Sequence, residues 1–233
     1  MLFGWFYYDW TVLIVLPALI FTIWAQIKVN STYKKYSDVM ARRGITAAEA
    51  ARRILDADGL HDVTIEHISG HLTDHFDPNA KVIRLSDSVY ASTSVAAIGV
   101  AAHEAGHAIQ HAKGYGPIRL RQAIIPVTKI GSMMAIPLFF LGLLMTLDIF
   151  MLLGIVLYAT IAFFQLVTLP VEFNASARAL ANLRSTNMLD SEELSGSKKV
   201  LTAAALTYVA ALLTSLLTLL RLIALASGGS RRR

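Results

Sequence analysis

Residues 94–111 read SVAAIGVAAHEAGHAIQH, and this stretch indicates which element of the fold carries the candidate functional residues. It is rich in alanine and has no proline, which predicts a buried helix over about Ser94–His111. Three ionisable side chains fall within about one turn of that helix, and buried charges need a compensating partner. A metal ion is such a partner, so the stretch predicts a helix that supplies metal ligands.

His103, Glu104 and His107 form the pattern H-E-x-x-H. Residues four apart lie on one face of a helix, so the two imidazoles can reach one Zn²⁺ at about 2.0–2.1 Å. Glu104 would act as general base, taking a proton from the attacking water and passing it to the leaving amine. The pattern also occurs by chance on surface helices, but the apolar flanks favour a zinc peptidase.

A catalytic zinc site needs a third protein ligand. The chain has no cysteine, and His111 lies roughly 12 Å along the helix axis from His103. The longer pattern HExxHxxGxxH would need Gly at 110 and His at 113, where the chain has Gln110 and Lys113. The remaining choice is a carboxylate that follows the motif.

Five acidic residues follow the motif: Asp148, Glu172, Asp190, Glu192 and Glu193. Asp148 separates two apolar runs, and the last three fall in a stretch that we interpret as a solvated loop. Glu172 follows Pro170 at the end of an apolar run, where a helix is expected to begin. We therefore predict Glu172 as the third ligand; the alternative is an acid that stabilises a helix N-terminus through the macrodipole.

The composition indicates an integral membrane protein. Of the 233 residues 55% are hydrophobic and 16% are charged, against about a quarter charged in average soluble proteins. The mean hydropathy is +0.54. Without cysteine, disulfides and thiolate metal sites are excluded. The net charge of +5 suggests membrane orientation, and no nucleic-acid partner is expected, because no basic helix interleaved with aromatics occurs.

Four apolar runs, over residues 10–27, 124–147, 149–169 and 200–226, approach the length that crosses a bilayer. Aromatic residues flank the first run as in an interfacial belt: Trp5, Tyr7, Tyr8, Trp10 and Trp24. Lys and Arg follow this run and none precede it, which places residues 28–123 and 170–199 in the cytoplasm. Arg221, interpreted as an interfacial anchor, and Arg231–Arg233 oppose that orientation.

The predicted fold is mainly α, a polytopic helical membrane protein of about four spans with a small α+β zincin-like cytoplasmic domain. Residues 1–29 would form an N-terminal anchor, 30–122 the zincin-like region, 123–169 a membrane hairpin, 170–199 a cytoplasmic segment with the third ligand, and 200–233 a last span with a basic tail.

Thr46 and Glu49 predict a capping box that starts a helix to about Ala57. Alternation predicts strands at 63–68 and 81–86.

Residues 103–110 (HEAGHAIQ), 169–176 (LPVEFNAS) and the stretch from His75-Phe76-Asp77-Pro78 to Ser86 together resemble the YugP-like family of bacterial membrane zinc metallopeptidases. The resemblance implies a neutral zinc peptidase of the gluzincin type, distantly similar to the HtpX and Ste24-like peptidases. It implies one zinc ion per chain, polypeptide substrates at the cell membrane and, by analogy, protein quality control. In those relatives an aspartate four residues after the glutamate ligand supports a zinc-binding histidine; here Ser176 takes that position.

Several roles stay open at this stage. Arg178, Tyr115 and His111 are candidates for the group that stabilises the oxyanion, with Arg178 preferred. Residues Val82, Ile83, Arg84 and Leu85 would form either a sheet edge that pairs with substrate or an ordinary internal strand. His67, His71 and His75 are interpreted as loop and strand residues rather than as a second metal site.

Two other functions are compatible with the same motif. One is an intramembrane-cleaving metalloprotease, which Lys113, Arg119 and Arg121 soon after the motif disfavour. The other is a non-catalytic membrane scaffold with a structural metal site, which would not need Glu104. A homo-oligomer or a membrane-protein partner is compatible with the sequence as well.

Overall fold

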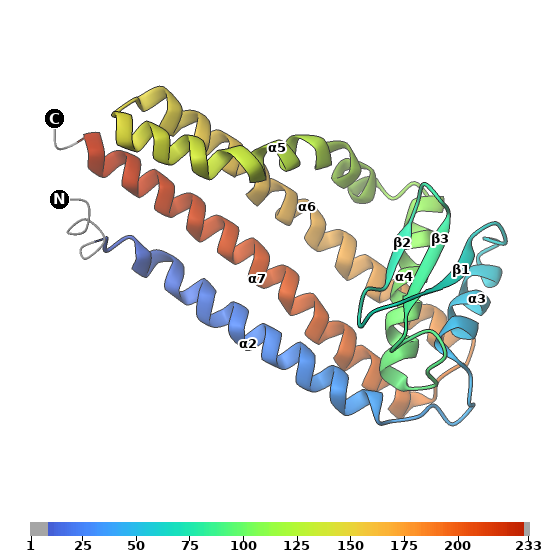
Figure 1. Cartoon of the computed structure of the whole chain (residues 1–233). Helices are drawn as coiled ribbons and strands as arrows, with labels where there is room; N and C mark the ends of the chain where they lie inside the picture. The colour runs from blue at the N-terminus through green and yellow to red at the C-terminus, as the bar shows by residue number, and fades with distance from the viewer. Residues whose placement is uncertain (1–8, 231–233) are drawn as a thin grey trace. The chain divides into compact units, whose positions relative to one another are not determined.

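The computed structural model describes residues 9–230 and is dominated by helices (Figure 1). The helices are α2 (Val12–Ser37), α3 (Ala47–Ala57), α4 (Val95–Ala112), α5 (Gly116–Met145), α6 (Asp148–Ser185) and α7 (Ser191–Ser230). The strands are β1 (Thr64–Ile68), β2 (His75–Asp77) and β3 (Val82–Ser86). The chain divides into a bundle unit, Met1–Ala25, Leu120–Thr168 and Thr207–Arg233, and a sheet unit, Gln26–Arg119 and Leu169–Leu206.

Four helices are long and apolar enough to cross a membrane: α2, α5, α6 and residues Ser191–Ser227 of α7. Large apolar side chains such as Leu13, Met133 and Leu144 are exposed along them, as lipid contact requires. The predicted class, mainly α with several apolar helices and a small sheet, is confirmed. Trp10 and Trp24 are exposed, whereas Trp5, Tyr7, Tyr8 and Arg231–Arg233 lie outside the described residues.

Small residues let α5 and α6 approach closely within the bundle unit. A Cβ on Gly131 would lie 2.6 Å from Thr160 Oγ1, and one on Gly154 would lie 2.8 Å from the carbonyl oxygen of Ala135. Packing at small residues is a main source of helix association in membranes, where the hydrophobic effect does not act between helices. The two helices are joined by Thr146 and Leu147 alone and form a helical hairpin.

Arg221 is paired within the bundle unit. Its Nη2 lies 2.7 Å from Asp9 Oδ2, and its Nε donates to Thr11 Oγ1 at 3.2 Å. The predicted anchoring at the interface is not tested by these contacts. They do show that the positive charge of Arg221, which opposes the inferred orientation, is compensated by a carboxylate.

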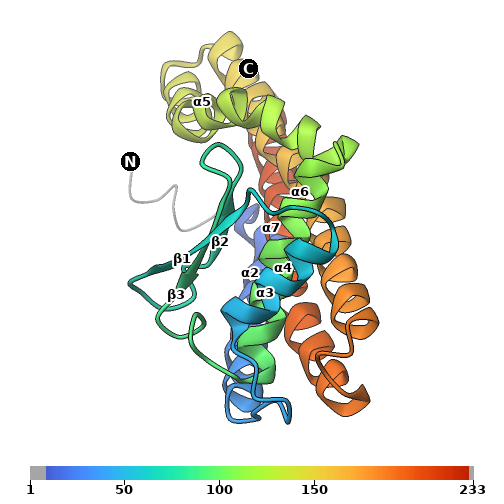
Figure 2. The ribbon, with the colours of Figure 1, turned by 90° about the vertical axis from the view of Figure 1, so that its right-hand side faces the viewer.

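The sheet of the sheet unit has the order β1-β3-β2, with β1 parallel and β2 antiparallel to β3 (Figure 2). The strands predicted at 63–68 and 81–86 are confirmed to within one residue, and the short β2 was not predicted. Of the two alternatives for Val82, Ile83, Arg84 and Leu85, the structure shows the ordinary internal strand and excludes the free sheet edge. Both sides of β3 are already hydrogen-bonded, so its backbone has no free edge for a substrate.

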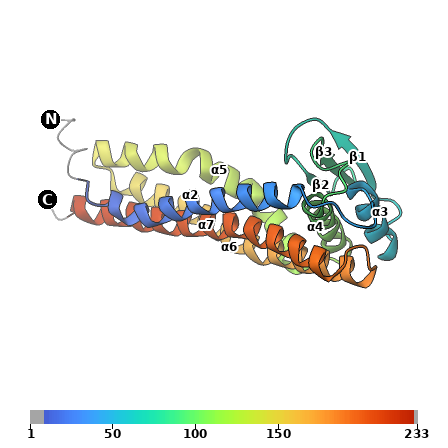
Figure 3. The ribbon, with the colours of Figure 1, turned by 90° about the horizontal axis from the view of Figure 1, so that it is seen from below.

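One face of this sheet packs on α3 and α4, as the three views show (Figures 1–3). The packed side chains include Ile54 and Leu55 of α3, Ile83 and Leu85 of β3, and Ile98 of α4, all fully buried. The predicted capping box at the start of α3 is confirmed: Glu49 N donates to Thr46 Oγ1 at 3.2 Å, and Thr46 N donates to Glu49 Oε2 at 2.9 Å.

The predicted helix start at Pro170 is wrong, because α6 runs unbroken through it from Asp148 to Ser185. Proline lacks the N–H that would bond to the residue four positions earlier, but membrane helices tolerate this loss. Glu172 therefore lies in a helix interior rather than at an N-terminus, which removes the macrodipole alternative.

The interpretation of residues 190–193 as a solvated loop is also wrong. Asp190 Oδ1 accepts hydrogen bonds from the backbone N–H groups of Glu192 and Glu193, both at 2.9 Å, and so caps α7. Glu193 is buried; its Oε2 accepts from Asp190 N at 2.9 Å, and its Oε1 accepts from Arg42 N at 2.7 Å. The carboxylate of Glu193 thus fixes the segment after α2 to the start of α7.

We predict that Glu193→Ala lowers the stability of the protein by about 2 kcal/mol, because two backbone N–H groups lose their acceptor. Thermal unfolding in detergent measures the effect. Glu192→Ala is the matched control, since the Glu192 side chain is 86% exposed, and it should change stability by less than about 0.5 kcal/mol. Equal effects of the two substitutions would contradict the role given to Glu193.

Candidate metal centre

Helix α4 carries the two histidines of the motif. Its N-cap is Ser94, whose side chain accepts a hydrogen bond from Ala97 N at 3.2 Å, and the helix ends at Ala112, which confirms the predicted element. His103 and His107 lie one turn apart with ring centroids 4.6 Å from each other. Their Nε2 atoms are 3.1 Å apart, so both rings present the same nitrogen to one point.

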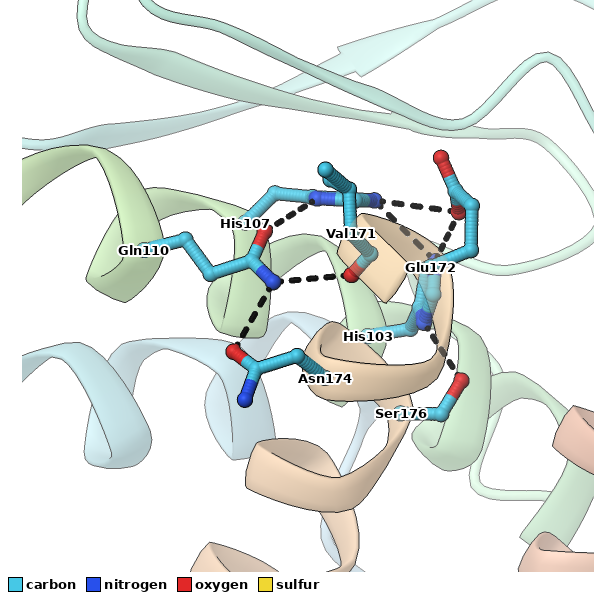
Figure 4. A network of polar contacts seen from close by, with 7 residues as sticks. All are labelled: His103, His107, Gln110, Val171, Glu172, Asn174 and Ser176. Atoms are coloured by element: carbon cyan, nitrogen blue, oxygen red, sulfur yellow. Dashed lines mark hydrogen bonds and ion pairs between the residues drawn. The ribbon is translucent and has the colours of Figure 1, made fainter. Parts of the chain in front are cut away.

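Glu172 reaches that point from α6, 69 residues further along the chain (Figure 4). Its Oε2 lies 3.2 Å from His103 Nε2 and 3.5 Å from His107 Nε2. The Glu172 side chain is only 4% exposed. Among the described residues, these three side chains form the one group with metal-ligand spacing.

The three distances match one zinc ion. Ligands at about 2.0–2.1 Å in a tetrahedral site lie about 3.3 Å from one another. The observed separations of 3.1, 3.2 and 3.5 Å form such a triangle. Two histidines and one glutamate are also a known donor set of catalytic zinc, and a tetrahedron leaves the fourth position for water or substrate.

Gln110 determines which nitrogen of His107 carries the proton. Its side-chain amide donates to the carbonyl oxygen of Val171 at 2.8 Å and to Asn174 Oδ1 at 3.0 Å (Figure 4). The Gln110 Oε1 atom must then face His107 Nδ1, 3.0 Å away, and accept its proton. In a neutral His107 the lone pair is therefore on Nε2, the atom that faces Glu172.

Ser176 stands in the same relation to the other histidine. Its hydroxyl lies 3.1 Å from His103 Nδ1, four residues after Glu172 on α6. Such contacts behind a metal-binding histidine hold the ring orientation. A hydroxyl at this distance can accept the Nδ1 proton.

The electrostatic field at the site favours a cation. Burial by itself lowers the pKa of His107, but hydrogen bonding to Glu172 and the charges of Glu104 and Glu172 outweigh it and raise the pKa above its usual value. Glu104 is 8% exposed and, within the described residues, receives no hydrogen bond. Its carboxylate oxygens therefore remain available to a water molecule beside the metal ligands.

Gly106, inside the motif, permits the contact between α4 and α6. A Cβ at this position would lie 2.6 Å from the carbonyl oxygen of Ala175 and 3.2 Å from its Cα. Backbone atoms cannot yield as a flexible side chain can. Only glycine therefore allows α6 close enough to bring Glu172 to the two imidazoles.

The other predicted residues contact groups other than the three candidate ligands. His111 is exposed and stacks edge-on against Phe76, and Arg178 Nε donates to Asn174 Oδ1 at 2.8 Å. Their oxyanion roles, and that of Tyr115, stay predictions. His67 pairs with Asp87 and His75 with the carbonyl of Thr73, in line with their interpretation as strand residues.

Gly106, Gln110 and Asn174 were not predicted as site residues. Gln110 follows His107 by three positions and so falls on the same face of the helix, a signal that could have identified it. Asn174 and the clash at Gly106 depend on the packing of two distant segments, for which the sequence pattern has no signal.

Multiple apolar helices and an H-E-x-x-H zinc-type donor group together define a class, the membrane zinc metallopeptidases. Residues 11–227 match the family model described as "Putative neutral zinc metallopeptidase", and the chain belongs to this family. The chain is 50% identical over 220 residues to "Putative membrane protease YugP" of Bacillus subtilis (strain 168), covering 94% of this chain and 97% of that protein. No solved structure matches the chain. The predicted family, its metal and the membrane location are confirmed.

We predict that Gly106→Ala weakens zinc affinity at least tenfold and lowers the midpoint of thermal unfolding, because the new methyl group meets the backbone of α6. A competition titration with a chromophoric chelator measures the affinity in detergent. Gly116→Ala is the control, since a Cβ there has no atom within 4 Å. An unchanged zinc affinity in Gly106→Ala would show that the close approach is not needed.

We further predict that Gln110→Leu lowers zinc affinity by about 10- to 100-fold, the range found when partners of metal ligands are removed. Leucine keeps the volume of the buried side chain but leaves His107 Nδ1 without its acceptor. The same titration measures it, with the exposed Gln26 changed to Leu as control. Equal affinities in the two variants would refute the orienting role.

Proposed function

We propose that this protein is a zinc endopeptidase that hydrolyses membrane or membrane-proximal polypeptides, with His103, His107 and Glu172 as metal ligands and Glu104 as general base. The observation that carries the proposal is the convergence of two imidazole lone pairs and one carboxylate, separated as the ligands of one tetrahedral zinc ion would be. The peptidase family of the chain supports the reaction type.

A bound zinc ion would polarise the scissile carbonyl and lower the pKa of an adjacent water. The residues of the chain supply the proton transfers and the positioning. Glu104 accepts the proton of the attacking water and delivers it to the amine that leaves when the C–N bond breaks. Gln110 and Ser176 keep the two imidazoles oriented, and Gly106 keeps the glutamate-bearing helix in place.

The free edge of β2 is the most suitable place for an extended substrate. Within the described residues β2 pairs only with β3, so its outer edge presents unpaired backbone groups. Phe76 of β2 contacts His111 of α4, two turns after His103, which connects this edge with the helix of the metal ligands. A peptide could add to β2 as a further strand, with binding through its backbone rather than through specific side chains.

The predicted domain boundaries and the cytoplasmic orientation are part of the proposal. Most of the Lys and Arg residues of the chain fall within residues 28–123 and 170–199, which between them contain all three ligands and the base. By the positive-inside rule the site faces the cytoplasm. Polypeptides at the inner face of the membrane are accordingly the proposed substrates, and protein quality control is the proposed context.

The test compares two carboxylate variants of the full-length protein in detergent. Glu104→Gln should retain about one zinc ion per chain and lose cleavage of an unfolded reporter protein by about 10²–10⁴-fold, because only the base is removed. Glu172→Ala should lose both zinc and cleavage. Elemental analysis gives the metal content, and gel electrophoresis gives the cleavage rate.

Glu192→Gln serves as a control for the loss of an exposed acid and should behave as the wild type. Chelation should abolish cleavage by the wild-type protein, and added zinc should restore it. A scaffold with a structural metal would bind zinc and show no cleavage that depends on Glu104. A wild-type cleavage rate in Glu104→Gln would show that Glu104 is not the general base.

A further inference from the structure

An open groove lined by α2 and α7 lies in the sheet unit, apart from the residues of the metal centre, and has a volume of about 610 Å³. The two helices run side by side in Figures 1 and 3. Four lysines line the groove: Lys28 and Lys35 of α2, and Lys198 and Lys199 of α7. No acidic side chain of the described residues lines it, so the groove carries an uncompensated positive charge.

The remaining lining adds hydrogen-bonding groups and an apolar end. Hydroxyls come from Ser31, Thr32, Tyr36, Ser195 and Thr202, and the apolar part from Ala203 and Leu206. The ammonium groups of Lys35 and Lys199 lie 5.7 and 6.0 Å from the centre of the Tyr36 ring, one from each helix. Hydroxyl and ammonium donors around a concave site favour a phosphate or another oxyanion.

The position of the groove along the sequence indicates where that oxyanion comes from. The apolar run of α2 ends at Ile27, directly before Lys28, and the last apolar run begins at Val200, directly after Lys199. In both helices the lysines thus mark the change from bilayer-facing to polar sequence. Lysines at such a boundary lie at the level of lipid headgroups.

The wall of the groove is closely packed at Gly196. A Cβ at Gly196 would lie 2.9 Å from two ring carbons of Tyr36, so glycine is needed for the ring to pack against α7. Behind this contact, Ser197 is buried and its hydroxyl donates to the carbonyl oxygen of Val95 at 2.8 Å. The segment of α7 that carries Lys198 and Lys199 is therefore fixed.

We propose that the groove between α2 and α7 binds the headgroup of an anionic phospholipid, with its phosphate among the four lysines and its glycerol end towards Leu206. Zwitterionic lipids are poor ligands because their own cation would meet the lysines. This site does not depend on the peptidase reaction, and its failure would leave the proposed function intact.

The test uses full-length protein in detergent, with phosphatidylglycerol or phosphatidylcholine added and bound lipid counted by native mass spectrometry. The wild type should bind phosphatidylglycerol at least tenfold more tightly than phosphatidylcholine. Lys35→Gln/Lys199→Gln should remove most of this preference. Lys34→Gln/Arg43→Gln loses the same charge at two exposed residues outside the groove and should stay within twofold of the wild type.

Equal losses in both double variants would show uniform attraction of lipid to a basic surface and overturn the site. Displacement of phosphatidylglycerol by 10 mM inorganic phosphate would also overturn it, in favour of a soluble anion. Ser31→Trp keeps every charge but fills the groove, so it should weaken phosphatidylglycerol binding even if the lysine variant unfolds. Unchanged binding in Ser31→Trp would refute a headgroup inside the groove.

Discussion

The close approach of α4 and α6 at Gly106 is the constraint on which the rest of the site depends. The carbonyl of Ala175 occupies the space that any other side chain at 106 would need. At this separation Glu172 Oε2 comes within 3.5 Å of both imidazole Nε2 atoms. A wider separation by even one methyl group would leave the glutamate outside bonding distance of an ion held by the histidines, because zinc ligands lie only about 2 Å from the metal. The metal-ligand geometry therefore depends directly on how closely the backbones of α4 and α6 pack.

The polar groups around that contact orient the two histidines, so that their Nε2 atoms and the Glu172 carboxylate face one point. Gln110 is fully buried and uses its amide on both sides: the N–H groups hold α6 through Val171 and Asn174, while the oxygen holds the His107 ring. Ser176 reaches His103 from the same stretch of α6. Residues of α6 therefore supply one candidate ligand and orient the two others. Because each Nδ1 is engaged from behind, each Nε2 is left to face the centre, where two lone pairs and a carboxylate would repel one another without a cation between them.

Local patterns in the sequence predicted most helices and strands. Features that depend on the packing of distant segments could not be predicted in this way. The capping box at Thr46, the uninterrupted helix over His103 and His107 and the four apolar runs follow from neighbouring residues, and the structure agrees with them. Glu172 was reached by elimination, on the mistaken idea that Pro170 begins a helix; the helix continues because membrane helices tolerate proline. The central position of β3 depends on the short β2, whose three residues have no clear alternation. The sequence contains no signal for Gly106, because its role is to make room for the backbone of Ala175, 69 residues away.

The position of Glu172 also explains why a membrane helix should carry a ligand. The apolar run of α6 ends at Leu169, so the glutamate follows lipid-facing sequence by less than one turn of the same unbroken helix. A helix fixed in a bilayer has little freedom to slide along its axis, because moving polar residues into hydrocarbon is costly. A ligand placed just beyond the apolar run is therefore held at a constant depth. The same change from apolar to polar sequence occurs at Lys28 and Lys199. Lys28, Glu172 and Lys199 thus all lie within one helical turn of the end of an apolar run.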